Sequence, residues 1–98
     1  MAILSTYYIG LNDKDTHRQE LKTSQAIELL VKTFEERGVE NYSYSFITGV
    51  YKGEVENTIK LELIDCGLCN QTVQELKRVF NQECILETIT ILAQSIYH

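Results

Sequence analysis

Apolar and polar residues alternate along the segment 54–65, where Val55, Ile59, Leu61 and Leu63 hold odd positions and polar side chains hold most even ones. Successive side chains of a strand point to opposite faces of its sheet. The alternation therefore predicts a strand with one buried and one solvated face.

Three other segments have the period and composition of strands. Residues 3–11 place Ile3, Tyr7 and Ile9 on one face, residues 41–51 are rich in aromatic and β-branched side chains, and residues 84–96 form a long final strand. Lys52-Gly53 lies between two of these strands and predicts a tight hairpin turn.

Two segments have helical periodicity. Ile27, Leu30, Val31 and Phe34 fall at helical spacing after Thr23 or Ser24 as the N-cap, and Gly38 follows as a helix-ending residue. A second helix is predicted to begin with Asn70 as its cap, and its apolar side consists of Val73, Leu76, Val79 and Phe80.

The predicted order is β-α-β-β-α-β, which favours an α+β, ferredoxin-like fold with two helices on one face of a four-stranded antiparallel sheet. Each helix has one apolar stripe, so the helices cover one face of the sheet only. The open face should carry mainly polar side chains: Thr6, Tyr8, Thr58, Lys60, Glu62, Thr88 and Thr90.

Composition limits the classes of function. Ninety-eight residues fit one domain spanning 1–98, and a formal net charge of -5 without a basic cluster argues against a nucleic-acid partner. No signal peptide or membrane-spanning run is recognisable, and three cysteines without a disulfide pattern fit the reducing cytoplasm.

Cys66 and Cys69 form the one short motif with chemical potential, a C-x-x-C. It fits a redox pair if Cys69 lies at a helix N-terminus, and a zinc site only if distant residues complete the four ligands. A structural loop is the third interpretation and the one adopted here. The sequence predicts no catalytic residue, no metal ligand and no cofactor.

Binding residues are predicted in the polar loop after the first strand and among the six tyrosines, because long polar loops often bind and tyrosine suits interfaces. The candidates are Tyr8, Asn12, Asp13, Asp15, His17, Tyr42 and Tyr44.

The stretches Thr6–Asp15 and Glu56–Leu63, roughly a fifth of the chain, resemble small uncharacterised proteins of bacteriophages and of mobile elements in Gram-positive bacteria. The resemblance includes no catalytic motif. It implies a compact accessory protein that binds a host factor.

These observations lead to three hypotheses of function. The first is a non-enzymatic protein-binding module that acts on a host protein through the open sheet face or the loop 12–22. The second is an ACT-like small-ligand sensor, which uses the loop after the first strand at a subunit interface. The third is an enzyme or redox protein built on Cys66 and Cys69.

We also predict a homodimer, formed through the open sheet face or the strand end 92–97, because Ile64, Leu86, Leu92 and Ile96 are apolar residues expected on the exposed side. Light scattering at micromolar concentration should give the mass of a dimer, and Leu92→Glu should give a folded monomer. A monomer mass for the unchanged protein would contradict this prediction.

Overall fold

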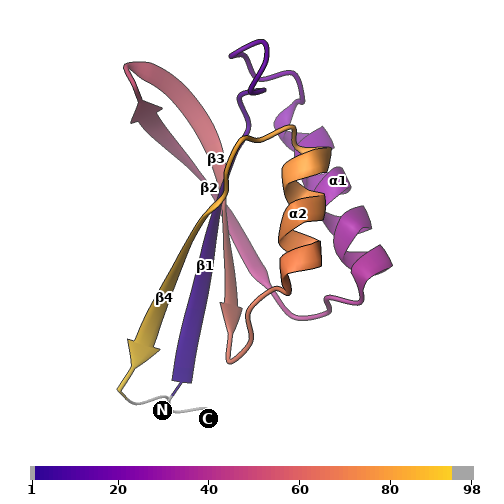
Figure 1. Cartoon of the computed structure of the whole chain (residues 1–98), viewed down its shortest axis with the longest axis vertical. Coiled ribbons are helices and arrows are strands. Elements are labelled where there is room, and N and C mark those ends of the chain that lie inside the picture. The colour runs from indigo at the N-terminus through magenta and orange to yellow at the C-terminus, as the bar shows by residue number, and fades with distance from the viewer. Residues whose placement is uncertain (1, 94–98) are drawn as a thin grey trace.

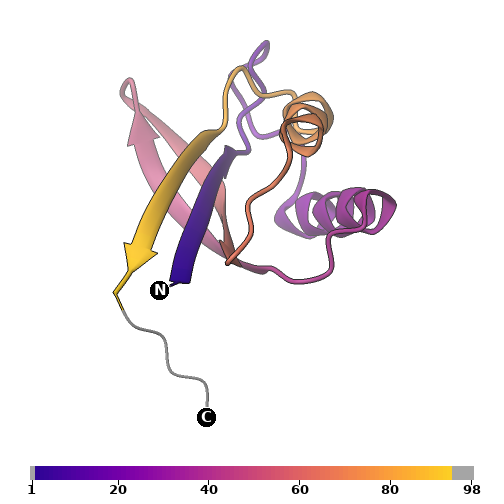
Figure 2. The ribbon, with the colours of Figure 1, turned by 60° about the horizontal axis from the view of Figure 1, so that its bottom comes forward.

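The alternating segment forms strand β3 (Glu54–Ile64), an interior strand of a four-stranded sheet with the order β2-β3-β1-β4. The computed structural model describes residues 2–93, and every neighbouring pair of strands in it is antiparallel. Both helices lie on one side of the sheet (Figures 1 and 2). The α+β, ferredoxin-like fold is confirmed, with the other elements β1 (Ala2–Gly10), α1 (Thr23–Arg37), β2 (Ser43–Tyr51), α2 (Asn70–Val79) and β4 (Leu86–Leu92).

The predicted turn joins β2 to β3. Lys52 and Gly53 have φ angles of 52° and 79°, so both central residues are in the left-handed region that a type I′ hairpin turn requires. The turn fixes the register, which pairs Tyr51 with Glu54 and Phe46 with Ile59.

The core lies between the helices and the odd-numbered faces of β1 and β3. Tyr7 is paired with Leu61 and Ile9 with Ile59, and all four side chains are 0% exposed. Burying one such side chain contributes roughly 1.5–3 kcal/mol relative to leaving it in water. The rest of the buried apolar cluster comprises Leu11, Ala26, Leu30, Phe34, Leu63, Leu76 and Phe80.

Helix α1 is rotated relative to its predicted stripe. Ala26, Leu30 and Phe34 are buried, whereas Ile27 and Val31 are half-buried at the flank. The small side chain of Ala26 at this position lets the helix lie close to the sheet. The predicted N-cap was also wrong, because the helix begins at Thr23 with Lys22 as its cap.

The side chain of Gln25 caps α1 instead of a hydroxyl, since its Oε1 accepts a hydrogen bond of 2.9 Å from the Lys22 amide. Helix α2 differs similarly from its prediction: Cys69 rather than Asn70 is the N-cap. Leu76 and Phe80 are buried as predicted, but Val73 is only half-buried.

Tyr7 connects three parts of the fold through its hydroxyl. The Leu68 amide donates to Tyr7 Oη at 2.8 Å, and Tyr7 Oη donates to Glu87 Oε2 at 3.1 Å. The sheet is thereby tied both to the loop before α2 and to the edge strand β4. Burial, more than any other effect, raises the pKa of Tyr7 above its ordinary value of 10.0, so the phenol remains a donor at neutral pH.

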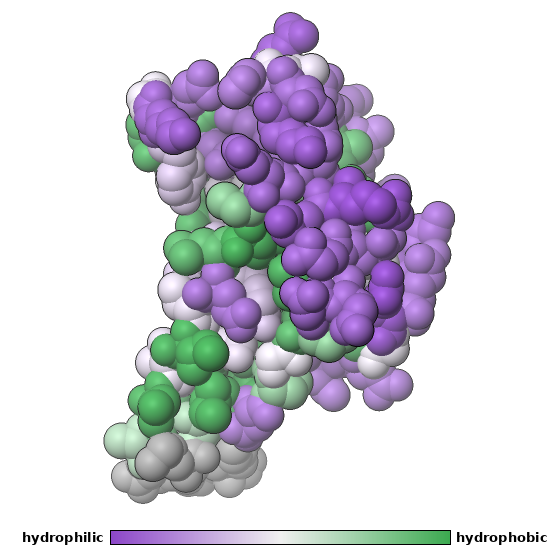
Figure 3. All heavy atoms as spheres, in the orientation of Figure 1, coloured by the Kyte–Doolittle hydropathy of each residue, from purple (hydrophilic) through white to green (hydrophobic). Residues whose placement is uncertain are grey.

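Strand β4 is shorter than the predicted 84–96, and residues 94–96 of that prediction lie outside the described part of the chain. Apolar side chains are exposed along the β1–β4 edge and its neighbours, including Ile3, Ile64, Leu86, Ile89 and Ile91. Figure 3 shows apolar surface at the lower end of the sheet, beyond the helices. Leu92 is half-buried. The homodimer stays a prediction.

Within residues 2–93, no helix combines the length and the apolar character needed to cross a bilayer.

Leu61→Ala should lower the free energy of unfolding by about 2–5 kcal/mol, because the substitution leaves a cavity in the middle of the buried cluster. Urea unfolding followed by circular dichroism measures the change. Val55→Ala is the matched control, since Val55 is on the same strand but 65% exposed, and it should cost less than about 0.5 kcal/mol. Equal effects of the two substitutions would contradict the burial of Leu61 in the core.

Candidate functional site

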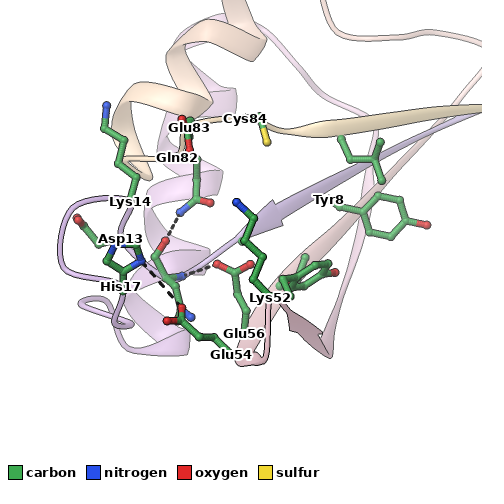
Figure 4. Close-up of a pocket in the computed structure, with 15 residues that line it drawn as sticks. Tyr8, Asp13, Lys14, His17, Lys52, Glu54, Glu56, Gln82, Glu83 and Cys84 are labelled. Carbon is green, nitrogen blue, oxygen red and sulfur yellow. Dashed lines mark hydrogen bonds and ion pairs between the residues drawn. The ribbon is translucent and has the colours of Figure 1, made fainter.

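A pocket of about 390 Å³ lies over the open face of the sheet at the end where the β2–β3 hairpin meets the loop after β1. Its floor includes Tyr8 and Thr58, and its walls come from residues 12–17, from residues 51–56 and from the segment 82–86 that leads into β4. Figure 4 shows the labelled side chains of these segments around the pocket. The site therefore requires three separate segments of the chain, residues 8–17, 51–58 and 82–86.

Two glycines make room for pocket side chains. A Cβ atom on Gly10 would lie 2.5 Å from a carboxylate oxygen of Glu56, and a Cβ atom on Gly49 would lie 2.8 Å from the Tyr51 ring. Glycine in a strand often marks such a close approach. The backbone amide of Asn12 holds the carboxylate of Glu56 there, because it donates a hydrogen bond of 3.0 Å to Glu56 Oε2.

The loop after β1 is fixed to the residues that follow α2. Asn81 Nδ2 donates to Asp13 Oδ2 at 2.8 Å, and Gln82 Nε2 donates to the Asn12 carbonyl at 2.7 Å. Asp13 Oδ1 also accepts hydrogen bonds from the amides of Asp15 and Thr16. These bonds, the one from Asn81 first, hold the pKa of Asp13 below its ordinary value of 3.8.

Thr58 places an unpaired hydroxyl at the pocket floor. The residue is 2% exposed, and its Oγ1 has no hydrogen-bond partner within the described residues. A buried polar group without a partner costs about 1–3 kcal/mol, so a ligand that supplies one would regain that free energy.

The pocket combines charges of both signs with aromatic and apolar surface. Carboxylates come from Asp13, Glu54, Glu56 and Glu83, whereas Lys14 and Lys52 supply ammonium groups. His17 Nδ1 lies 3.9 Å from Glu54 Oε2, but both side chains are largely exposed, so this pair adds little stability. A small ligand with an aromatic ring, hydroxyls and a mixture of charges would suit these groups.

Four of the seven predicted binding residues line this pocket: Tyr8, Asn12, Asp13 and His17. Asp15 is exposed beside it and accepts a hydrogen bond from Asn81 at 2.9 Å. Tyr42 packs edge-on against Phe34 with ring centroids 4.6 Å apart, and Tyr44 lies beside Phe46, both away from the pocket.

Sequence reasoning missed most of the lining residues that the tertiary structure brings to the pocket, among them Lys52, Glu56, Thr58, Gln82 and Cys84. The glycine at the end of β1 was the available signal, because it marks a point where another side chain approaches the backbone.

Cys66 and Cys69 lie outside this pocket, and no disulfide links them. In the described part of the chain, no group of three or more His, Cys, Asp or Glu side chains is arranged to hold a metal ion.

No protein-family model matches the chain, and no curated protein matches it. Two solved structures share its fold. A phage SAM lyase in complex with S-methyl-5′-thioadenosine aligns with a TM-score of 0.64 and 21% identity over 91% of this chain and 80% of that chain. A phage SAM lyase in the apo state aligns with a TM-score of 0.63 and 24% identity over 90% of this chain and 78% of that one.

Both neighbours are enzymes, and this finding overturns the prediction of a non-enzymatic function, including its ACT-like alternative. The absence of a recognised catalytic motif was not a sound reason to exclude catalysis. The phage setting agrees with both neighbours, while the resemblance to proteins of Gram-positive mobile elements stays a prediction.

Asp13→Asn should destabilise the protein at neutral pH, because the folded state holds the ionised carboxylate through three hydrogen-bond donors. A folded-state pKa below 3.8 means that this stability is complete above that value and is lost as the pH falls through the folded pKa. Urea unfolding of the unchanged protein and of Asp13→Asn, from pH 7 to pH 2.5, should show that the difference between their free energies of unfolding narrows at acid pH. A difference that does not depend on pH would contradict the role of the carboxylate.

Proposed function

We propose that the protein is a lyase that binds S-adenosylmethionine in the pocket over the open sheet face and releases S-methyl-5′-thioadenosine. The observation that carries this proposal is the fold shared with a SAM lyase over 91% of the chain, together with a pocket suited to a nucleoside.

The proposed reaction requires few catalytic groups from the protein. S-methyl-5′-thioadenosine arises when the bond between the sulfonium sulfur and the four-carbon amino-acid fragment breaks and its electron pair stays on sulfur. As this bond breaks, the carboxylate oxygen of the fragment can bond to the carbon that leaves sulfur and close a lactone. Alternatively, a base such as a pocket carboxylate can take a proton from the neighbouring carbon, and a carbon–carbon double bond forms. The sulfonium is already a good leaving group, so positioning supplies much of the rate.

Several pocket residues can each bind one part of S-adenosylmethionine. The rings of Tyr8 and Tyr51 offer faces for the adenine or for the sulfonium cation. Glu56 can accept hydrogen bonds from the ribose hydroxyls, in the way acidic residues hold ribose elsewhere, and the Thr58 hydroxyl can gain the partner it lacks among residues 2–93. Lys52 can pair with the amino-acid carboxylate.

The purified protein should convert S-adenosylmethionine to S-methyl-5′-thioadenosine above the rate of a sample without protein, measured by liquid chromatography. The amount of product should equal the amount of substrate lost. Production at the protein-free rate, together with no binding of either compound by calorimetry, would contradict the proposal.

Glu56→Gln should weaken binding of S-adenosylmethionine and S-methyl-5′-thioadenosine alike, by roughly tenfold or more, because both carry the ribose that Glu56 is assigned to hold. Calorimetry measures both affinities. Glu62→Gln is the matched control, since Glu62 is on the open face of the same strand but does not line the pocket. A loss confined to the sulfonium compound would reassign Glu56 to the positive sulfur.

A further inference from the structure

A second cavity of about 310 Å³ lies where the loop after α1 meets the loop before α2, away from the first pocket. Cys66 and Cys69 both line it, and so do Arg37 at the end of α1 and Glu40 in the loop that follows. Figure 1 shows these two loops at the lower end of the helices. Two thiols, a cation and a carboxylate thus share one cavity.

Cys69 has the surroundings of a reactive thiol. It is the N-cap of α2, and its Sγ lies 3.2 Å from Thr72 Oγ1. The hydrogen bond from the Thr72 side chain and then that from the Thr72 amide lower the pKa of Cys69 from its ordinary value of 9.0, with a smaller effect of Arg37. A helix N-terminus favours the thiolate form of cysteine, and the thiolate is the form that attacks a disulfide.

The loop between the two cysteines is held in place by the core. The Leu68 amide donates to the buried Tyr7 hydroxyl at 2.8 Å, and a Cβ atom on Gly67 would lie 3.2 Å from that same oxygen. Cys66 and Cys69, on either side of this fixed point, are both exposed. Both sulfurs are therefore accessible from the cavity without unfolding the loop.

We propose that Cys66 and Cys69 form a thiol–disulfide exchange site for small disulfides that carry carboxylate groups. The Cys69 thiolate attacks one sulfur of the small disulfide, forms a mixed disulfide and expels one thiolate. The Cys66 thiolate then attacks Cys69 Sγ, forms the Cys66–Cys69 disulfide and expels the second thiolate. The two protein thiols are oxidised, and the small disulfide is reduced to two thiols.

Arg37 and Glu40 give this cavity a preference for small disulfides that carry carboxylate and ammonium groups. The Arg37 guanidinium can bind a carboxylate of the small disulfide, and Glu40 can bind an ammonium group. Arg37 Nη2 is already 3.7 Å from Glu75 Oε2 at a partly exposed position, so a second carboxylate meets a cation that has donors left to offer.

The test uses glutathione disulfide and intact-mass spectrometry on a Cys84→Ser background, which removes the third thiol. This protein should lose two hydrogens and retain no glutathione. The further variant Cys66→Ser should hold one glutathione on Cys69, and it should do so about tenfold faster than the further variant Cys69→Ser gains one on Cys66. Equal rates, or a protein that holds two glutathiones, would overturn the proposal.

Two controls show whether the difference in reactivity between the two thiols comes from the folded cavity or from the residues next to each cysteine. In concentrated urea the rates of the two variants should become equal, and a preference that persists there would overturn the role of the cavity. If a serine variant does not fold, brief alkylation of the unchanged protein and peptide mapping should show Cys69 labelled before Cys84.

Arg37→Gln tests the preference for carboxylates. It should slow the reaction with glutathione disulfide several-fold and leave that with uncharged hydroxyethyl disulfide unchanged. An equal effect on both disulfides would overturn the assignment of Arg37 as the carboxylate-binding group.

Discussion

The structure depends on the antiparallel pairing of β1 with β3, because these two strands carry both the core and the floor of the pocket. Odd-numbered residues in the middle of both strands, among them Tyr7 and Leu61, are buried under the helices. Even-numbered residues face the other side, and those at one end of the sheet, Tyr8 and Thr58 among them, line the pocket. A shift of one residue in this pairing would exchange the two faces, so the hydrophobic requirement of the core also sets the positions of the site.

The pocket forms at the end of the sheet where two glycines leave room for the side chains of neighbouring residues. Gly10 and Gly49 lack the side chains that would collide with Glu56 and Tyr51. Asn81 and Gln82 hold the loop after β1 across this end of the sheet. The site thus needs the hairpin, the first loop and the end of α2 together, and a small change in the packing of α2 would alter the pocket through Asn81 and Gln82.

The proposed lyase function is compatible with a sequence that has no short catalytic motif. Nucleophilic catalysis leaves recognisable patterns, because a base must activate a particular side chain. A sulfonium substrate carries its own leaving group, so an enzyme for it needs well-placed binding groups instead. The groups proposed here for that role, Tyr8, Glu56 and Thr58, are not recognisable along the sequence, and only the fold brings them to one pocket.

The sequence by itself determined the order of the elements, the ferredoxin-like architecture and the buried faces of β1 and β3, because alternation along a strand is a local property. Lys52-Gly53 likewise predicted its own turn, since the left-handed conformation is encoded locally. The loop after β1 was predicted to bind a ligand or partner, and it supplies Asn12, Asp13 and His17 to the pocket.

Only the tertiary structure decided which neighbours complete the site. The rotation of α1 that buries Ala26 instead of Ile27 follows from packing against the sheet. Lys52 and Glu56 from the β2–β3 hairpin and Gln82 from the segment after α2 meet the loop after β1 at the pocket. No local pattern specifies such contacts, because they depend on how strands and helices pack once the core has formed.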